Sequence, residues 1–415
     1  MSIPGVAILV TMDSKGPEAR FLADALGESG VRPLLVDLSC RPHGAGGSDV
    51  TGAEVAAAAG RSWDDLARME RNTASEVMME GGRKIVAEKF QSGEIQGAVG
   101  LGGANGTSMA CAIMRALPPL APKVMVSVVA ATAAVQWYVA ESDIIMFPSI
   151  GDISLNRITR GVLTNAALAL AGMVKQEDAA GESDSSATPL IGVSSFGGTA
   201  ACVERVEKRL TETGYEVMFF HASGPGGRAL ESLAGLGELA GVVDVTTHEL
   251  TDLLVDGVYS AGAGRLEAAG AAGIPQVVVP GALDHANFWT GQVPEKYRNR
   301  AFFQYNAQNL LMRTSREEFE ALGVMMAEKL NRAKGPLSVM IPAKGYSEHT
   351  KRKAHDLEGR EVCDWRQPEV DAAFATSLKE HLNTGEIVTL DMHVNDPAFA
   401  DACADKMIEM LARGG

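Results

Sequence analysis

The sequence has no apolar run long enough to span a membrane. A membrane-spanning helix needs about 20 consecutive apolar residues, whereas the apolar segments of this 415-residue chain are short and interrupted by glycine or polar residues. The amino terminus runs directly into the apolar segment 3–10, without a basic leader or a small-residue cleavage site. These absences predict a cytoplasmic protein that does not enter membranes.

Cysteine is scarce as well. The chain has five cysteines, which are widely scattered and form no Cys-x-x-Cys pair: Cys40, Cys111, Cys202, Cys363 and Cys403. A disulfide framework needs an even number of cysteines, and many zinc and redox sites use Cys-x-x-Cys motifs. We therefore expect a protein of a reduced compartment.

Basic charge is in deficit. The chain has 37 Lys and Arg against 52 Asp and Glu, which gives a net charge of −15. Such a chain repels the phosphate backbone of nucleic acids unless a basic face is set apart. The basic run 351–353 is followed by Asp356 and Glu358, which is typical of a solvated turn. No nucleic-acid partner is expected.

What the sequence does contain is an alternation of short apolar runs with helical patterns. In the first half, the runs predicted to be buried strands are 5–11, 32–38, 97–103, 123–129 and 143–149. Continuous runs of Val, Ile and Leu are typical of parallel strands that helices cover on both faces. Between them, segment 62–90 predicts a long helix with a polar face.

The alternation stops at residues 176–189, whose small polar side chains cannot bury enough surface to pack. It then resumes with predicted strands at 190–197, 215–221, 241–247, 276–280, 337–341 and 386–391, and with helices at 198–213 and 397–413. We predict two doubly wound, mostly parallel, Rossmann-like α/β lobes, 1–175 and 190–415, joined by a polar linker. Their similar beginnings fit either an internal duplication or two copies of a common architecture.

The turn after the third predicted strand is rich in glycine. It reads Gly102-Gly103-Ala104-Asn105-Gly106-Thr107-Ser108 and precedes a helix predicted to begin near Met109. Three glycines and an asparagine permit positive φ, so that successive backbone N–H groups can converge on an anion, and the two hydroxyls add donors. The alternative is a tight turn whose hydroxyls cap the helix.

The turn after the first predicted strand carries a second signal. Asp13 or Ser14 can cap the following helix. Lys15 opposes the helix macrodipole there unless an anion shares the site. Asp37 ends the second predicted strand, where a Rossmann-like site places a carboxylate for a ribose hydroxyl. A solvated strand-end aspartate is the alternative.

Polar side chains also follow the strands of the second lobe. His221, Glu249 and Asp284, together with His393 and Asp396, can form a carboxylate and imidazole cluster for acid/base chemistry. In this prediction His221 is the general base, and Glu249 and Asp284 hold Mg²⁺. The alternative is that each is structural, with Asp284 capping the turn after its strand.

Seven segments carry a resemblance to a known family, in this order along the chain: 11–16, 102–108, 125–127, 152–158, 221–224, 280–284 and 393–397. They read Thr-Met-Asp-Ser-Lys-Gly, Gly-Gly-Ala-Asn-Gly-Thr-Ser, Met-Val-Ser, Asp-Ile-Ser-Leu-Asn-Arg-Ile, His-Ala-Ser-Gly, Pro-Gly-Ala-Leu-Asp and His-Val-Asn-Asp-Pro. Over nearly its whole length the chain resembles the Tm-1-like ATP-binding domain family.

The resemblance implies two subdomains, a homodimer, and ATP bound by the first lobe. Position by position, it implies phosphates that lie against Gly102, Gly103, Gly106, Thr107 and Ser108, with Lys15 and Ser127 nearby. Asp13, Ser14, Asp37 and Asn105, from the turns described above, complete the predicted ATP-binding set. The family loop more commonly reads Gly-Gly-Ser-Gly-Gly-Thr, so Ala104 and Asn105 depart from it and one hydroxyl is lost. Plant members carry a further TIM-barrel domain, which makes a separate TIM-barrel protein a predicted partner.

The apolar helix predicted at 164–173 favours the same homodimer, unless it is buried inside its own lobe.

The sequence and the resemblance leave two functions open. The first is an ATP-dependent enzyme, a phosphotransferase or hydrolase, that acts on a small acid or carbonyl substrate between the lobes. The second is a non-catalytic nucleotide-binding regulator that binds a partner protein.

Overall fold

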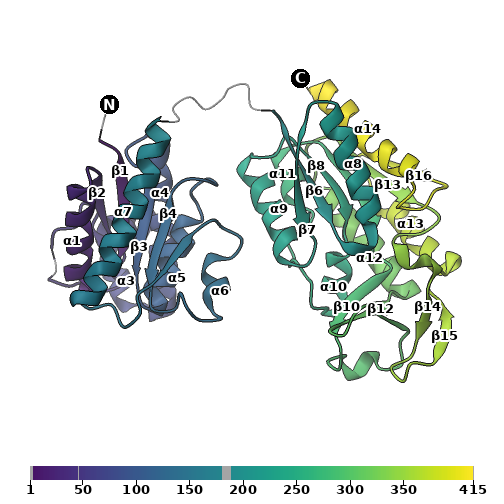
Figure 1. Cartoon of the computed structure of the whole chain (residues 1–415), viewed down its shortest axis with the longest axis horizontal. Helices are drawn as coiled ribbons and strands as arrows, with labels where there is room; N and C mark the ends of the chain where they lie inside the picture. The colour runs from purple at the N-terminus through teal and green to yellow at the C-terminus, as the bar shows by residue number, and fades with distance from the viewer. Residues whose placement is uncertain (1–2, 45, 180–187, 415) are drawn as a thin grey trace. The chain divides into compact units, whose positions relative to one another are not determined.

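The chain forms two compact α/β units, residues 1–185 and 186–415 (Figure 1). The structure is a computed structural model that describes residues 3–44, 46–179 and 188–414. It confirms the predicted fold class, since each unit is built on a parallel sheet. The predicted linker, 176–189, stays a prediction, because residues 180–187 lie outside the described ranges.

The first unit contains a five-stranded sheet in the order β2-β1-β3-β4-β5, and all of its strand pairs are parallel. Its strands are β1 (Gly5–Val10), β2 (Arg32–Asp37), β3 (Gly97–Gly102), β4 (Lys123–Ser127) and β5 (Ile145–Pro148). The chain continues from β1 to β2 on one side of the sheet and from β3 to β4 on the other side. The carboxyl ends of β1 and β3 therefore form a topological switch point, where ligands bind in doubly wound folds.

Helices cover both faces of this sheet. They are α1 (Met12–Glu28), α2 (Gly52–Ala58), α3 (Trp63–Arg68), α4 (Arg71–Gln91), α5 (Ala104–Met114), α6 (Val135–Val139) and α7 (Arg157–Ala179). Alternate side chains of β1 enter two separate cores: Ala7 and Leu9 pack with α4 and α5, while Val6 and Ile8 pack with α1 and α7. Figure 1 shows α1 and α7 side by side.

The second unit repeats this topology. Its six parallel strands lie in the order β16-β13-β9-β8-β6-β7. They are β6 (Leu190–Ser195), β7 (Glu216–His221), β8 (Gly241–Thr246), β9 (Gln276–Gly281), β13 (Leu337–Pro342) and β16 (Glu386–Leu390). The switch point of this sheet therefore lies between β6 and β8.

An antiparallel sheet in the second unit was not predicted from the sequence. Its order is β10-β12-β11-β14-β15, and its strands are β10 (His285–Trp289), β11 (Phe302–Gln304), β12 (Asn309–Arg313), β14 (Lys353–His355) and β15 (Glu361–Asp364). Strand β10 begins four residues after β9 ends. The antiparallel sheet thus starts at the carboxyl edge of the parallel one.

The helices of the second unit are α8 (Ala200–Glu212), α9 (Pro225–Leu236), α10 (Glu249–Val255), α11 (Ala268–Ala272), α12 (Arg316–Leu330), α13 (Pro368–His381) and α14 (Pro397–Gly414). Three short 3₁₀ helices are η1 (Gly197–Thr199), η2 (Glu295–Tyr297) and η3 (Glu348–Lys351). No helix of the described residues is long and apolar enough to cross a membrane.

Two local predictions were wrong. The helix predicted over 62–90 is two helices, because Glu70 has an extended ψ of 148° between α3 and α4. Helix α5 begins at Ala104 rather than near Met109. The apolar helix predicted at 164–173 lies within α7, where Ala167 and Leu170 are buried in the core of the first unit and Leu168 is exposed. The dimer itself stays a prediction.

Candidate functional site

A cavity of about 550 Å³ lies at the carboxyl edge of the first sheet. Its lining comes from the turns after β1, β2 and β3 and from the start of α4: Thr11, Asp13, Ser14, Lys15, Cys40, Arg41, Arg71, Gly103, Ala104, Asn105 and Gly106. These turns meet because their parallel strands end at the same edge. The cavity therefore occupies the switch point between β1 and β3.

Three cationic side chains line this cavity. Lys15 donates a hydrogen bond from Nζ to the carbonyl of Ile153 and lies 3.7 Å from a carboxylate oxygen of Asp152. Arg41 is held by hydrogen bonds to the carbonyl oxygens of Cys40, Leu66 and Met69, at 2.9, 2.8 and 2.5 Å. Arg71 is exposed at the start of α4. In a chain of net charge −15, this concentration of positive charge favours an anionic ligand.

The amino terminus of α5 adds backbone donors to the cavity. The N-cap residue of this helix is Gly103, and no side chain caps the helix there. The first N–H groups of a helix have no partner within the helix, and they carry the positive end of its dipole. The start of α1 differs, because Asp37 accepts from the N–H of Met12 at 3.2 Å and Ser39 accepts from that of Asp13 at 3.0 Å. Helix α5 is thus the better anion-binding terminus.

The two neighbouring glycines in this loop have different roles. A Cβ on Gly102 would lie 2.9 Å from the Cα of Gly106, so Gly102 allows β3 and α5 to pack closely. A Cβ on Gly103 would meet nothing within 4 Å and would instead enter open space beside the cavity. The prediction of positive φ in this loop was wrong, since Gly102, Gly103, Asn105 and Gly106 all keep ordinary backbone angles.

Several predicted ligand residues have other partners. Asp37 is buried and accepts hydrogen bonds from the N–H and hydroxyl of Ser39 and from the Nε2 of His43. Thr107 and Ser127 are buried and share a hydroxyl hydrogen bond of 2.7 Å. Five of the predicted ligand residues do not line the cavity: Asp37, Gly102, Thr107, Ser108 and Ser127. They support the turns, whereas Asp13, Ser14, Lys15, Gly103, Asn105 and Gly106 face the cavity.

Neither Arg41 nor Arg71 was predicted from the sequence to belong to the site. Arg41 follows β2 by only four residues, so its position after a strand end was an available signal. Arg71 had no such signal, because it begins α4 and reaches the site only through the packing of α4 against the sheet.

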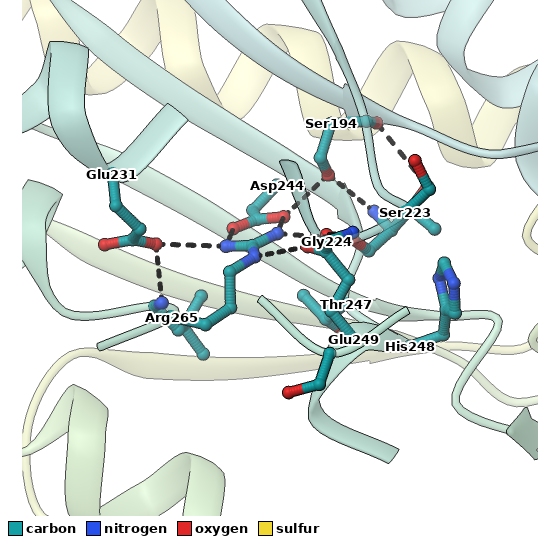
Figure 2. Close-up of polar contacts among 12 residues, drawn as sticks. Ser194, Ser223, Gly224, Glu231, Asp244, Thr247, His248, Glu249 and Arg265 are labelled. Carbon is teal, nitrogen blue, oxygen red and sulfur yellow. Dashed lines mark hydrogen bonds and ion pairs between the residues drawn. The ribbon is translucent and has the colours of Figure 1, made fainter. Parts of the chain in front are cut away.

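In the second unit, a buried arginine organises the carboxyl edge of the sheet. Arg265 forms ion pairs with Asp244 at 2.5 Å, Glu249 at 2.7 Å and Glu231 at 3.2 Å. Burial alone would lower the pKa of this guanidinium, but the charge of the three carboxylates raises it well above its usual value. Figure 2 shows the guanidinium between Asp244 and Glu231. Glu249 also accepts from the N–H of Gly224 at 2.7 Å, so its carboxylate is structural.

Asp284 lies in a different environment. One oxygen accepts hydrogen bonds from the hydroxyl of Ser347 at 2.7 Å and from the Nε1 of Trp365 at 2.8 Å, and the other lies 3.2 Å from the Nδ1 of His285. Burial alone would raise the pKa of Asp284, but the hydrogen bond with His285, the charge of Arg313 and the hydrogen bond from Ser347 lower it below its usual value. Asp284 is therefore an ionised carboxylate that orients an imidazole.

Asp284 and Glu249 do not share a metal site. The described residues contain no group of three or more His, Cys, Asp or Glu side chains placed to hold a metal ion. His393 and Asp396 are also engaged elsewhere, since the Nε2 of His393 contacts Thr350 and the carbonyl of Ser347, and Asp396 accepts from the N–H of His393. The predicted Mg²⁺ pair is thus not brought together.

The structure instead assembles histidines that the site prediction omitted. The ring of Phe196, in the turn after β6, lies 5.3 Å from the exposed His221 and 4.2 Å from the buried His248. The His285 ring lies 5.7 Å from that of His248 and 5.5 Å from that of His349. His248 and His285 follow strand ends that the sequence analysis had recognised, but His349 comes from η3 and had no such signal.

These buried imidazoles have nitrogens without hydrogen-bond partners. They are both nitrogens of His248, Nε2 of His285 and Nδ1 of His349. Leaving a buried polar atom unpaired costs about 1–3 kcal/mol. Burial lowers the pKa of His349 to about 4 and that of His248 well below its usual value, so both rings are neutral at pH 7. The second unit thus holds a cluster of buried imidazoles at the carboxyl edge of its sheet, of which His248 and His349 are neutral.

Comparison with protein families finds a match over nearly the whole chain. The N-terminal and C-terminal domain models of the uncharacterised protein family UPF0261 match residues 4–179 and 188–411. A UPF0261 protein of Clostridium tetani is 41% identical over 415 residues, which cover 98% of this chain and 99% of that protein. One of Rhizobium meliloti is 38% identical over 403 residues, or 96% of each chain.

The ToMV resistance protein Tm-1(GCR237) of Solanum lycopersicum is 37% identical over 323 residues, which cover 76% of this chain but 42% of the tomato protein. Among solved structures, a UDP-N-acetylglucosamine 2-epimerase from Rickettsia bellii aligns over 99% of this chain and 97% of its own, with 11% identity and a TM-score of 0.24. A similarity at that level carries no information about the site.

Proposed function

The chain belongs to the UPF0261 family, and from that premise we propose that its first unit binds ATP in the cavity between β1 and β3 and that the protein is an ATP-dependent enzyme. One observation carries the binding proposal. A cavity of about 550 Å³ combines Lys15, Arg41 and Arg71 with the uncapped amino terminus of α5. Pockets for ligands of this size usually measure about 300–1,000 Å³.

The lining residues fit a nucleotide. Phosphate oxygens accept hydrogen bonds from helix N-termini and from cationic side chains, so Gly103, Asn105 and Gly106 would hold them with the three cations. Gly103 leaves the approach to these amides open, because nothing lies within 4 Å of the position of its absent Cβ. ATP would supply a phosphoryl group, and Asp13 and Ser14 offer polar contacts at the rim.

The catalytic part of the proposal rests on the second unit. Its strand ends carry buried ionisable side chains, which are typical of sites that bind and transform a small molecule. We assign the substrate to the class of small acids and carbonyl compounds. The alternative is a non-catalytic regulator that binds a partner protein, and the printed name of the tomato relative, a ToMV resistance protein, favours it.

Calorimetric titration of the full-length chain with ATP tests the binding site. Arg71→Gln should weaken ATP binding by about tenfold, since a hydrogen bond to a charged group is worth about 1.5–3 kcal/mol. Its melting temperature should not change, because Arg71 is exposed. Arg61→Gln is the matched control, an exposed arginine of the same unit outside the cavity. Equal losses in both variants would refute the site.

Product formation separates the enzyme from the regulator. ATP with a panel of small hydroxy and keto acids should yield a phosphorylated product or released phosphate. Tight ATP binding without any turnover would instead favour the regulator.

A further inference from the structure

The imidazole cluster of the second unit has the features of a site for proton transfer. We propose that His285 and His248, backed by Asp284 and Asp252, form an acid/base site for an enolisable carbonyl compound, with His285 as the base. The proposal deepens the carbonyl-substrate part of the proposed function, on which it rests. It uses only residues of the second unit and requires no nucleotide.

His285 is positioned as a base by its neighbours. Ser347 and Trp365 both donate to Oδ2 of Asp284, which leaves Oδ1 for the Nδ1 of His285 at 3.2 Å. A carboxylate beside one ring nitrogen holds the proton there and leaves the lone pair on the other. The Nε2 of His285 therefore carries a bare lone pair, and it is buried without a partner.

His248 provides the second half of the site. Its ring is fully buried and lies 5.7 Å from that of His285, at an interplanar angle of 27°. Its Nε2 is 4.0 Å from Asp252, whose carboxylate accepts from the N–H and the Nδ2 of Asn287 at 2.9 and 3.0 Å. Neither nitrogen of His248 has a partner, so the ring has both an N–H and a lone pair available for a ligand.

The neutrality of His248 and His349 selects the substrate class. Burial lowers the pKa of both rings below the usual value of a histidine. Neutral imidazoles do not balance a phosphate dianion. A neutral N–H does stabilise a carbonyl oxygen that becomes negative only during reaction, as in known isomerase sites. An aldehyde, ketone or 2-oxo acid therefore fits the cluster better than a phosphate does.

The proton transfer balances without a co-reactant. The Nε2 of His285 takes the proton from the carbon next to the carbonyl, and the C–H electron pair forms the C=C bond of the enolate. The carbonyl π electrons move to oxygen, which accepts a hydrogen bond from His248. The proton then returns to carbon from the imidazolium of His285, after exchange with solvent.

Phe196 marks the entrance to this site. Its ring is half-buried and contacts the exposed His221 on one side and the buried His248 on the other. It lies in the turn after β6, at the switch point of the second sheet. A substrate would therefore arrive at the strand ends, where ligands bind in open α/β sheets.

Hydrogen exchange into substrates in D₂O tests the proposal. Pyruvate, 2-oxobutyrate and dihydroxyacetone are incubated with the full-length chain at neutral pD without nucleotide, and the loss of their C–H signals is followed by proton NMR. We expect at least one substrate to exchange tenfold faster than in buffer. His285→Gln should abolish that acceleration, so that exchange falls back to the rate in buffer. His381→Gln, an exposed histidine of α13, should retain it.

Asp284→Asn is the second variant, because it keeps the shape of the side chain but removes the charge behind His285. Because Asp284 acts only by positioning His285, Asp284→Asn should lower kcat of exchange and leave KM nearly unchanged. Acceleration of none of the three substrates, or full acceleration in both variants, would overturn the proposal. Either result would leave the ATP titration of the first unit unaffected, so the two failures are distinguishable.

Discussion

At the scale of single residues, His349 is a side chain whose charge depends on burial. Its ring lies 5.2 Å from Phe303 and 5.9 Å from Trp365, and burial lowers its pKa from 6.5 to about 4. Because the folded-state pKa is the lower one, protonation favours the unfolded chain. The stability that comes from the neutral ring is therefore present above pH 6.5 and is lost as the pH falls toward 4.

This residue gives a prediction about pH. Between pH 6.5 and pH 5, His349 should lower the free energy of unfolding by about 2 kcal/mol. His349→Phe keeps an aromatic ring in the same contacts and removes this loss. Urea unfolding of both proteins at pH 7 and pH 5 measures the effect. Burial raises the pKa of Asp252 to about 7, so this residue stabilises the fold as the pH falls. Because Asp252 is present in both proteins, the difference between them reports His349 alone. Parallel pH profiles of the two proteins would contradict it.

A site residue could be predicted from the sequence where its charge is unusual for its position in the predicted fold. Lys15 was singled out because a cation opposes the dipole at a helix start, and it does line the cavity. Asp37 was singled out by its place at a strand end alone, yet its carboxylate is occupied by Ser39 and His43. Which partner a carboxylate finds depends on tertiary packing, and local sequence does not encode that.

At the scale of elements, Arg265 joins several parts of the second unit. Its ion pairs reach Asp244 in β8, Glu249 in α10 and Glu231 in α9. Glu231 also accepts from the N–H groups of Ala268 and its two predecessors, at the start of α11. One guanidinium thus forms ion pairs with carboxylates from three elements.

Removing this guanidinium should therefore destabilise the second unit severely. Arg265→Met leaves buried carboxylates without a counter-charge, and breaking one partner of a buried pair costs about 3–5 kcal/mol. Arg205→Met, which removes a partly exposed ion pair with Asp401, should destabilise the protein far less. Thermal unfolding of both variants measures the difference. A melting temperature of Arg265→Met close to that of Arg205→Met would contradict this account.

Elements were predictable where their pattern was strong. All of the parallel strands of the described residues were recognised, and the central ones are continuous apolar runs because they are covered on both faces. The antiparallel strands were missed, since β11 and β14 have only three residues each and carry polar side chains. The early start of α5 was missed because glycine and asparagine at 103–106 favour a turn on propensity alone. Packing of Gly102 against Gly106 overrides that preference.

At the scale of the whole molecule, the two units share one topology. Each sheet begins with the order second-first-third strand, and in each unit polar side chains gather at the carboxyl ends of the strands. The first cluster is cationic, with Lys15, Arg41 and Arg71, while the second contains the imidazoles of His248, His285 and His349. We propose that the first cluster binds an anion and that the second binds a small carbonyl compound.

This division predicts where ATP protects the backbone. Hydrogen–deuterium exchange of the full-length chain should slow at residues 103–107 and 13–15 when ATP is added, because a bound phosphate occupies the amides at the start of α5. The turn 221–227 of the second unit serves as the internal control and should exchange at the same rate. Protection confined to the second unit would place the nucleotide elsewhere.

The most direct test of the central claim is calorimetric titration of Gly103→Val with ATP. The substitution should leave the fold intact, since Gly103 has φ −73° and open space at its Cβ. Its branched side chain should block the amides of α5 and abolish measurable ATP binding, while Gly27→Val, another glycine with open space, binds as the parent does. A folded Gly103→Val protein that binds ATP with the affinity of the parent would contradict the account.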